Sequence, residues 1–211
     1  MVKQNSCIFI SGNGTNLKAL IKNSKDYKFP INICLIITNN KNARGLNLAK
    51  LYNIPFNIFD LGKLRDQQKA LTELKKRKIT LICLAGYMKI LSKDFIKKFN
   101  GKIINIHPSL LPKYKGLNTH QRALDSKEKY SGCTVHYVNS KLDSGKIILQ
   151  KKVKIFKNDN SEKLAKRILN QEHLLYPQAI KNKDNFSGCT VHFVDKKLDS
   201  GKIIMQKKVR I

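Results

Sequence analysis

Two polar side chains at the end of one apolar run have the types and spacing for acyl chemistry. The run KIINIH (102–107) contains Asn105 and His107, which a β-strand presents on the same face because they are two residues apart. An amide and an imidazole at the carboxyl end of a buried strand can together stabilise a developing oxyanion. Without further context, the stronger alternative is that both side chains satisfy backbone groups of the loop NIHPSLLPKYKG.

A carboxylate that can support this imidazole follows 36 residues later, at Asp143 in the phrase LDSGK. A carboxylate beside a histidine favours the charged imidazolium and fixes the orientation of the ring. His107 and Asp143 together would then form a general acid. The alternative is an ordinary hairpin turn, because Asp, Ser and Gly are common turn residues.

A glycine-rich turn near the N-terminus has the chemistry of an anion site. SGNGTN (11–16) follows the apolar run CIFI and precedes the helical pattern LKALIKN. Free backbone N–H groups at the start of a helix, together with the helix dipole, suit a phosphate. The spacing matches neither GxGxxG nor the P-loop, so a tight turn that requires glycine is an equal alternative.

The segment 161–180 predicts a helix, with Ser161 as its N-cap and with Leu164 and Ile168 on one apolar face. Glu172 lies late in this helix, where a solvated side chain is the simplest interpretation. Among the histidines we expect His120 to line a site. His136 and His192 are predicted to lie on strand surfaces, and His173 is left without a role.

The elements that must position these residues indicate an α/β fold. Continuous apolar runs alternate with helical patterns over the first half of the chain, which predicts a mostly parallel sheet with helices on both faces. From Gly132 the runs CTVHYV and KIILQKKVKI alternate apolar and polar residues, which is typical of antiparallel strands. The strands expected before that point are CIFI (7–10), ICLIIT (33–38), FNIFDL (56–61), TLICLAGY (80–87) and KIINIH (102–107), and helices are expected over 62–77 and 94–99.

The end of the chain repeats a stretch found 56 residues earlier. SGCTVHFVDKKLDSGKIIMQKKVRI (187–211) copies SGCTVHYVNSKLDSGKIILQKKVKI (131–155), and 22 of the 33 positions from Ala123 are identical. We therefore predict a domain over 1–181 and an appended partial duplicate of 126–155 over 182–211. The duplicate contains Asp199 in place of Asp143. Its expected state is left open between a peripheral hairpin, a hairpin exchanged with a second molecule and an assembly artefact.

Composition narrows the class of protein further. The formal net charge is +28, but only six of the 42 basic residues are arginine and Trp is absent. Nucleic-acid readers usually concentrate arginine and aromatic residues on one face, so we expect no nucleic-acid partner. No apolar run is long enough to span a membrane or serve as a signal peptide, so we expect no membrane partner and a cytoplasmic location. The cysteines are expected to be buried thiols, with no metal site: Cys7, Cys34, Cys83, Cys133 and Cys189.

Five stretches, in this order, carry a family resemblance: SGNGTNL, LAGYMKILS, NIHPSLLPKYKGLNTH, GCTVHYVNSKLDSGKIILQ and QEHLLYP. Together they resemble the phosphoribosylglycinamide formyltransferases, folate-dependent enzymes of purine synthesis, over about residues 6 to 180. HPSLLPKYKG with a downstream LDSG is specific for the wider formyltransferase family. The resemblance implies a Rossmann-like formyltransferase fold and formyl transfer from 10-formyltetrahydrofolate to the amine of glycinamide ribonucleotide. No metal is implied, and a homodimer is possible.

The resemblance also implies roles for residues at matching positions. Asn105 and His107 flank the tetrahedral centre, His107 is the proton donor, and Asp143 favours its charged form. Gly14, Thr15 and Asn16 hold the substrate phosphate, and Glu172 faces the substrate amine. The co-substrate folate contacts Asn105 and a segment that presents backbone groups to the pterin, which comprises Met88, Lys89, Ile90 and Leu91.

The chain departs from the family pattern at several points. Lys89 stands where many relatives carry arginine, and Asn118 stands where they carry histidine. The arginine expected near the folate is Arg65, with Lys63 as the alternative. The rival functions are another 10-formyltetrahydrofolate enzyme, such as a deformylase or a methionyl-tRNA formyltransferase, and an inactive basic binding protein.

Overall fold

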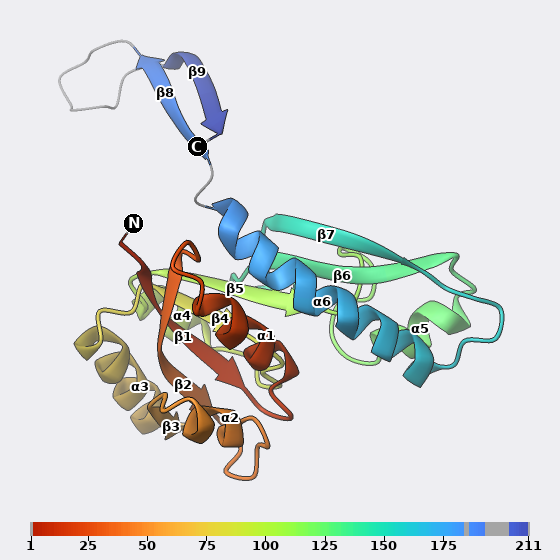
Figure 1. Ribbon diagram of the computed structural model, residues 1–211, viewed down its shortest axis with the longest axis horizontal. Coiled ribbons are helices and arrows are strands. Elements are labelled where there is room, and N and C mark those ends of the chain that lie inside the picture. Colours follow the sequence, from red (N-terminus) through yellow and green to blue (C-terminus); the bar gives the residue numbers. More distant parts are fainter. Residues whose placement is uncertain (1, 184–185, 193–202, 211) are drawn as a thin grey trace.

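The computed structural model describes residues 2–183, 186–192 and 203–210, and for residues after 182 it describes the backbone alone (Figure 1). In these ranges the chain forms six helices and two β-sheets. The strands are β1 (Gln4–Ile10), β2 (Ile31–Thr38), β3 (Phe56–Ile58), β4 (Leu81–Leu84), β5 (Lys102–His107), β6 (Tyr130–Tyr137), β7 (Ile147–Lys154), β8 (Phe186–His192) and β9 (Ile203–Arg210). The helices are α1 (Thr15–Ser24), α2 (Leu46–Leu51), α3 (Leu64–Lys76), α4 (Lys93–Lys98), α5 (Thr119–Asp125) and α6 (Ser161–Lys183).

The large sheet has seven strands in the order β3-β2-β1-β4-β5-β6-β7. The first five of these pair in parallel, whereas β6 pairs antiparallel with β5 and β7 pairs antiparallel with β6. The chain runs from β1 towards β3 on one side and from β4 towards β7 on the other. The strand order therefore reverses between β1 and β4, which is where open α/β sheets usually bind their ligands. This architecture confirms the predicted α/β fold with an antiparallel C-terminal part.

Two apolar clusters cover the two faces of this sheet. One contains side chains of α1 and α6, including Leu17, Leu20 and Ile168, and the other contains Leu74 of α3 and Phe95 of α4. The continuous apolar runs in β1, β2 and β4 exist because successive side chains of these strands enter opposite clusters. Cys7, Cys83 and Cys133 are buried, as predicted, whereas Cys34 is only partly buried.

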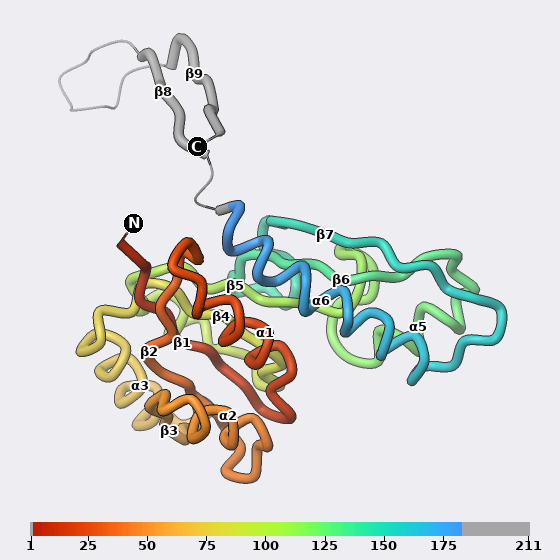
Figure 2. The backbone as a smooth tube through the Cα atoms, in the orientation of Figure 1, coloured from red at the N-terminus to blue at the C-terminus, as the bar shows by residue number. Residues whose placement is uncertain are grey.

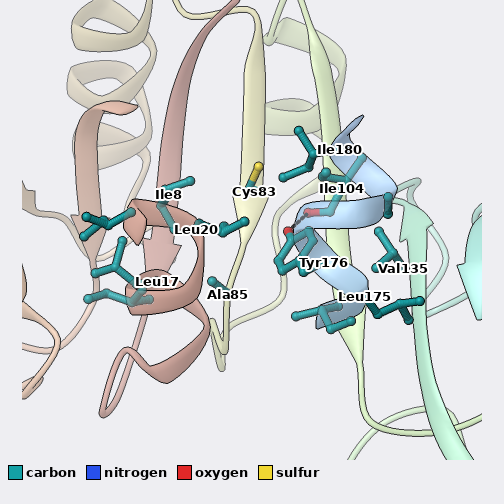
Figure 3. Close-up of a cluster of buried hydrophobic side chains, with 14 of the residues drawn as sticks. Ile8, Leu17, Leu20, Cys83, Ala85, Ile104, Val135, Leu175, Tyr176 and Ile180 are labelled. Carbon is teal, nitrogen blue, oxygen red and sulfur yellow. Dashed lines mark hydrogen bonds between the residues drawn. The ribbon is translucent and has the colours of Figure 1, made fainter. Parts of the chain in front are cut away.

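Helix α6 connects the two halves of the sheet. Its Tyr176 is fully buried and its hydroxyl donates hydrogen bonds to the carbonyl oxygens of Leu84 (3.0 Å) and Ile104 (3.2 Å). Figure 3 shows this ring pointing from α6 towards the strand that contains Ile104. The helix also lies beside α1, although more than a hundred residues separate them in the sequence (Figure 2). The N-terminal and C-terminal ends of the domain therefore meet on one face.

The second sheet consists of β8 and β9 alone and repeats the pairing of β6 with β7. Phe186 pairs with Arg210, as Tyr130 pairs with Lys154, and the later pairs follow with the same 56-residue offset. Even the register shift recurs, between Val135 and His136 in the first hairpin and between Val191 and His192 in the second. The predicted division of the chain at residue 181 stays a prediction. Asp199 lies outside the described residues.

The local elements differ from expectation in a few places. The N-cap of α6 is Asn160 rather than Ser161, because the side-chain oxygen of Asn160 accepts a 2.9 Å hydrogen bond from the backbone N–H of Lys163. The short helices α2 and α5 were not predicted, and each contains at most seven residues. Across the described part of the chain, no helix combines the length and the apolar character that a membrane span requires.

Candidate active site

A cavity of about 890 Å³ opens at the carboxyl ends of β1, β4 and β5. These strands end beside the point where the strand order reverses, and the loops that follow them form its walls. Helix α6 contributes the opposite wall. The site residues that line it are Gly14, Thr15, Asn16, Met88, Lys89, Ile90, Leu91, Asn105, His107, Asp143 and Glu172.

The turn after β1 brings the start of α1 to this cavity. Gly14 caps the helix in the left-handed conformation (φ 72°), and the first turn of α1 contains no acidic residue. A Cβ atom on Gly14 would lie 2.7 Å from the Cα atom of Gly45, so glycine is required by both conformation and space. The first backbone N–H groups of α1 have no partner within the helix. This end of the cavity can therefore bind an anion.

His107 is buried at the end of β5, and its two ring nitrogens have different partners. Nε2 lies 2.9 Å from the carbonyl oxygen of Tyr114, which can only accept, so Nε2 carries a hydrogen. Nδ1 lies 3.4 Å from Oδ2 of Asp143. That distance is long for a hydrogen bond, so Nδ1 retains capacity for a closer partner in the cavity.

Asp143 is held in place by the backbone as well as by the ring. Its Oδ2 accepts a 2.9 Å hydrogen bond from the N–H of Gly116, and its side chain is only 9% exposed. Its backbone is left-handed, with φ 43°, which is uncommon for a residue other than glycine. The structure thus brings His107 and Asp143 together, as the sequence analysis predicted.

Asn105 is oriented by a second buried histidine. The two residues are directly opposite in the register of β5 and β6, and Nδ2 of Asn105 lies 3.2 Å from Nε2 of His136. Nδ1 of His136 lies 2.8 Å from the carbonyl oxygen of Tyr137, so this nitrogen donates and Nε2 accepts from Asn105. Burial lowers the pKa of His136 despite the carboxylate of Asp143 nearby, which agrees with a neutral ring. The second N–H of the Asn105 amide remains available to a ligand.

The expectation that His136 lies on a strand surface is wrong. The residue is only 2% exposed, because both faces of β6 are covered. Helix α6 packs on one face, and on the other the Pro-rich loop is bound through the Leu111 N–H to the hydroxyl of Thr134. Alternation predicted the strand correctly, but only the pairing of β5 with β6 reveals that His136 faces Asn105.

Glu172 lies in the cavity wall and is bound to the first turn of α1. Its Oε2 accepts a 2.7 Å hydrogen bond from Nδ2 of Asn16. Burial raises the pKa of Glu172 to about 7, and the bond from Asn16 opposes that rise. Oδ1 of Asn16 is buried and has no hydrogen-bond partner among the described residues. The helix pattern suggested a solvated Glu172, but the structure buries this side chain beside a second buried acceptor, Oδ1 of Asn16.

The loop after β4 forms the more open wall. Met88 and Ile90 are 68% and 76% exposed, although both line the cavity. The backbone N–H of Met88 donates a 2.8 Å hydrogen bond to Oγ of Ser11, which fixes this loop to the end of β1. The carbonyl oxygen of Gly86, in the same loop, accepts a 3.1 Å hydrogen bond from the N–H of Ser11.

Other predicted residues lie in different places. His120 lines the cavity, as expected, and burial together with the nearby His107 lowers its pKa. Arg65 and Lys63 are exposed at the start of α3 and do not line this cavity. Within the residues that the structure describes, no three His, Cys, Asp or Glu side chains are grouped as metal ligands would be.

Comparison with known proteins identifies the family. The model of the formyl transferase family matches residues 4–180, and it matches residues 176–211 separately. The chain belongs to the formyl transferase family. The cavity described above is therefore a cavity of a formyl transferase.

Individual relatives agree with the family match. The formyl transferase chain is 44% identical over 178 residues to a phosphoribosylglycinamide formyltransferase of Haemophilus influenzae, covering 82% of this chain and 84% of the relative. It is 42% identical to the trifunctional purine biosynthetic protein adenosine-3 of Chironomus tentans, covering 82% of this chain but only 13% of that much longer protein. The crystal structure of phosphoribosylglycinamide formyltransferase from Anaplasma phagocytophilum superposes with a TM-score of 0.82 at 39% identity, over 95% of this chain and 93% of that one. The expected formyltransferase fold is thus confirmed.

Proposed function

We propose that this formyl transferase transfers a formyl group from 10-formyltetrahydrofolate to the amine of glycinamide ribonucleotide, in purine biosynthesis. The observation that carries the proposal is the contact of His107 with Asp143, beside Asn105, in the cavity of a formyl transferase. Relatives named phosphoribosylglycinamide formyltransferase support the choice of substrate.

The first step is attack by the substrate amine on the formyl carbon. The new C–N bond forms as the carbonyl π electrons move to oxygen, which becomes an oxyanion. Two donors suit that oxygen: Nδ1–H of His107 and the second N–H of the Asn105 amide. A preorganised donor at such a position typically contributes about 3–4 kcal/mol to transition-state stabilisation.

The second step breaks the bond between the formyl carbon and the folate nitrogen. The oxyanion electrons re-form the carbonyl, the attacking nitrogen loses a proton, and the folate nitrogen gains one as it leaves. His107 is the proton donor in this scheme. The carboxylate of Asp143 stabilises its charged form and, through the Gly116 N–H, keeps a fixed position relative to the ring.

Substrate binding is assigned to the α1 end of the cavity. Gly14, Thr15 and Asn16 hold the phosphate through the first backbone N–H groups of α1. The Asn16 side chain is engaged with Glu172, so its contribution to phosphate binding is through the backbone. Glu172 and the unpartnered Oδ1 of Asn16 are acceptors, which suits a donor such as the substrate amine.

The folate is assigned to the open wall made by Met88, Lys89, Ile90 and Leu91. The exposed apolar side chains of Met88 and Ile90 suit an aromatic ring such as the pterin. Arg65, with Lys63 as the alternative, stays a prediction for the folate tail. Its position outside the cavity restricts it to a part of the ligand that extends beyond the rim.

Asp143 rather than Asp199 is assigned to catalysis, because the duplicate cannot reach the position of β6 in its own chain. Helix α6 starts beside α5, which leads into β6, and its 23 residues extend roughly 34 Å to the opposite end of the sheet. β8 begins three residues after Lys183, a reach of about 10 Å, whereas β6 is roughly 26 Å long. β8 would therefore start at the wrong end of the sheet.

A turnover assay with 10-formyltetrahydrofolate and glycinamide ribonucleotide tests the proposal, on the full chain and on a chain that ends after Lys181. Formylated product from both chains is the expected result. Hydrolysis of the folate without transfer would favour a deformylase. An inactive full chain with an active truncation would mean that the duplicate blocks the cavity. Salt-sensitive DNA binding with no turnover by either chain would favour the basic binding protein.

The proposal includes small-molecule partners only. A homodimer and a cytoplasmic location stay predictions. The chain spans only 13% of the length of the Chironomus relative, so we do not propose the other activities of that protein for this chain.

A further inference from the structure

One short segment, residues 114–116, contacts His107 directly and also supports its other partner, Asp143. The carbonyl oxygen of Tyr114 accepts from Nε2 of His107 at 2.9 Å, and the N–H of Gly116 donates to the carboxylate that faces Nδ1. Movement of this segment therefore displaces both groups that fix the ring. The contacts that hold residues 114–116 therefore determine how well the proton donor, His107, is oriented.

The segment is held from outside the cavity by the Tyr114 side chain. Its hydroxyl donates a 3.0 Å hydrogen bond to Oε1 of Glu128, which follows α5 in the chain. Nζ of Lys113 lies 2.6 Å from the same oxygen, and the Glu128 side chain is 25% exposed. The guanidinium of Arg122 lies 5.3 Å from the centre of the Tyr114 ring and donates to the carbonyl of Lys115.

The Tyr114 backbone requires such support. Its φ is 55°, which is the left-handed region that non-glycine residues rarely occupy. In that conformation its carbonyl points at the ring of His107, while its side chain points away to Glu128. One residue thus joins the catalytic ring to a carboxylate that does not line the cavity.

We infer that Glu128 is a positioning residue: through the Tyr114 hydroxyl it holds the Tyr114 carbonyl against Nε2 of His107, so that Nδ1 is the nitrogen that serves the reaction. Glu128 touches neither the cavity nor the ring, and its side chain contacts Tyr114 and the neighbouring Lys113. The inference rests on the proposed role of His107. The hydrogen on Nε2 is fixed by an acceptor that cannot donate, and this leaves Nδ1 to face Asp143.

The test compares Glu128→Ala, Tyr114→Phe and the double variant with the native chain, because a glutamine at position 128 could still accept from the Tyr114 hydroxyl. Tyr114→Phe removes the hydroxyl and keeps the carbonyl. We expect each single change to lower kcat about three- to ten-fold, with KM for both substrates within two-fold. The double variant should match Glu128→Ala, because Tyr114→Phe then removes a hydrogen bond that is already absent. Asp125→Asn is the matched control: it removes a nearby charge whose described partner is Gln121, and it should leave kcat unchanged.

A readout independent of turnover separates this inference from the proposed function. The solvent-exchange rate of the His107 Nε2 hydrogen, measured by NMR, should rise at least several-fold in Glu128→Ala and in Tyr114→Phe, and stay unchanged in Asp125→Asn. An exchange rate equal to that of the native chain in both variants would overturn the inference. Independent, multiplying losses of kcat in the double variant would do the same. A native chain without turnover but with the expected exchange rates would leave the inference intact and remove the proposed function.

Discussion

Oδ2 of Asp143 lies 3.4 Å from Nδ1 of His107 and accepts a 2.9 Å hydrogen bond from the N–H of Gly116. We expect Asp143→Asn to lower kcat roughly 10²- to 10⁴-fold, because the imidazolium loses its counter-charge. The asparagine can still accept from the Gly116 N–H, so the loop should keep its position. Steady-state kinetics with both substrates measures the change.

The chain supplies the matched control for this experiment. Asp199→Asn makes the same change in the same phrase, LDSGK, and should leave kcat within two-fold of the native value. A severe loss in Asp199→Asn with a mild loss in Asp143→Asn would reverse the assignment.

His136→Phe tests the orientation of Asn105. The phenyl ring has similar shape but no acceptor for Nδ2 of Asn105, so the amide can rotate away from the oxyanion. We expect kcat to fall about ten-fold, the effect of one ordinary hydrogen bond lost from the transition state. His192→Phe is the duplicate's equivalent change and should have no effect on kcat. Equal losses in both variants would contradict the assignment.

Glu172 gives the protein a distinct pH dependence of stability. Its pKa is raised from 4.5 to about 7 in the folded protein, so the folded state holds its proton more tightly than the unfolded state. The contribution of Glu172 to the free energy of unfolding should therefore be highest below about pH 4.5. It should fall as pH rises to about 7, by roughly 3 kcal/mol, and then level off.

Glu172→Gln should remove this fall, since an amide does not titrate and can still accept from Asn16. Urea unfolding at pH 5, 6, 7 and 8 measures the difference between the two proteins. A difference that is constant across this range would mean that Glu172 is not the titrating group.

Gly14→Ala tests the close approach of two glycines behind the α1 turn. The added methyl would lie 2.7 Å from the Cα atom of Gly45, in a backbone conformation that alanine rarely adopts. We expect a loss of about 1–3 kcal/mol of stability, which lowers Tm by several degrees in a protein of this size. Gly12→Ala is the control, because its Cβ would meet no atom within 4 Å, and it should change Tm by less than two degrees. Equal Tm values for the two variants would count against the steric argument.

The sequence predicted the sheet well because buried parallel strands have a strong signal. CIFI and ICLIIT are continuous apolar runs, and each lies within a strand of the structure. Helix α4 is as short as α2 and was predicted, but it begins with a side-chain cap at Ser92, whereas α2 and α5 begin without one. Their positions depend on packing against the sheet rather than on their own sequence.

The site was predicted in part. His107, Asp143 and Asn105 were found through their types and through a family resemblance that covers most of the chain. His136 was missed because its role depends on strand register, which alternation alone does not give. The contact of Glu172 with Asn16 was not predicted for a similar reason, since neither helix sequence shows that α6 packs against α1. The support of Tyr114 by Glu128 depends on the left-handed backbone of Tyr114, which the residue type does not predict.

The hydrogen bond between Asn16 and Glu172 spans 156 residues of sequence. A chain synthesised from its N-terminus at about 5–20 residues per second needs roughly eight to thirty seconds to add that many residues. During this interval β1 and α1 are present, but α6 is not, so the Asn16 amide and the part of α1 that packs on α6 lack their partners. The α1 end of the cavity contains some of the first residues to be made. It is nevertheless among the last parts of the enzyme to be completed.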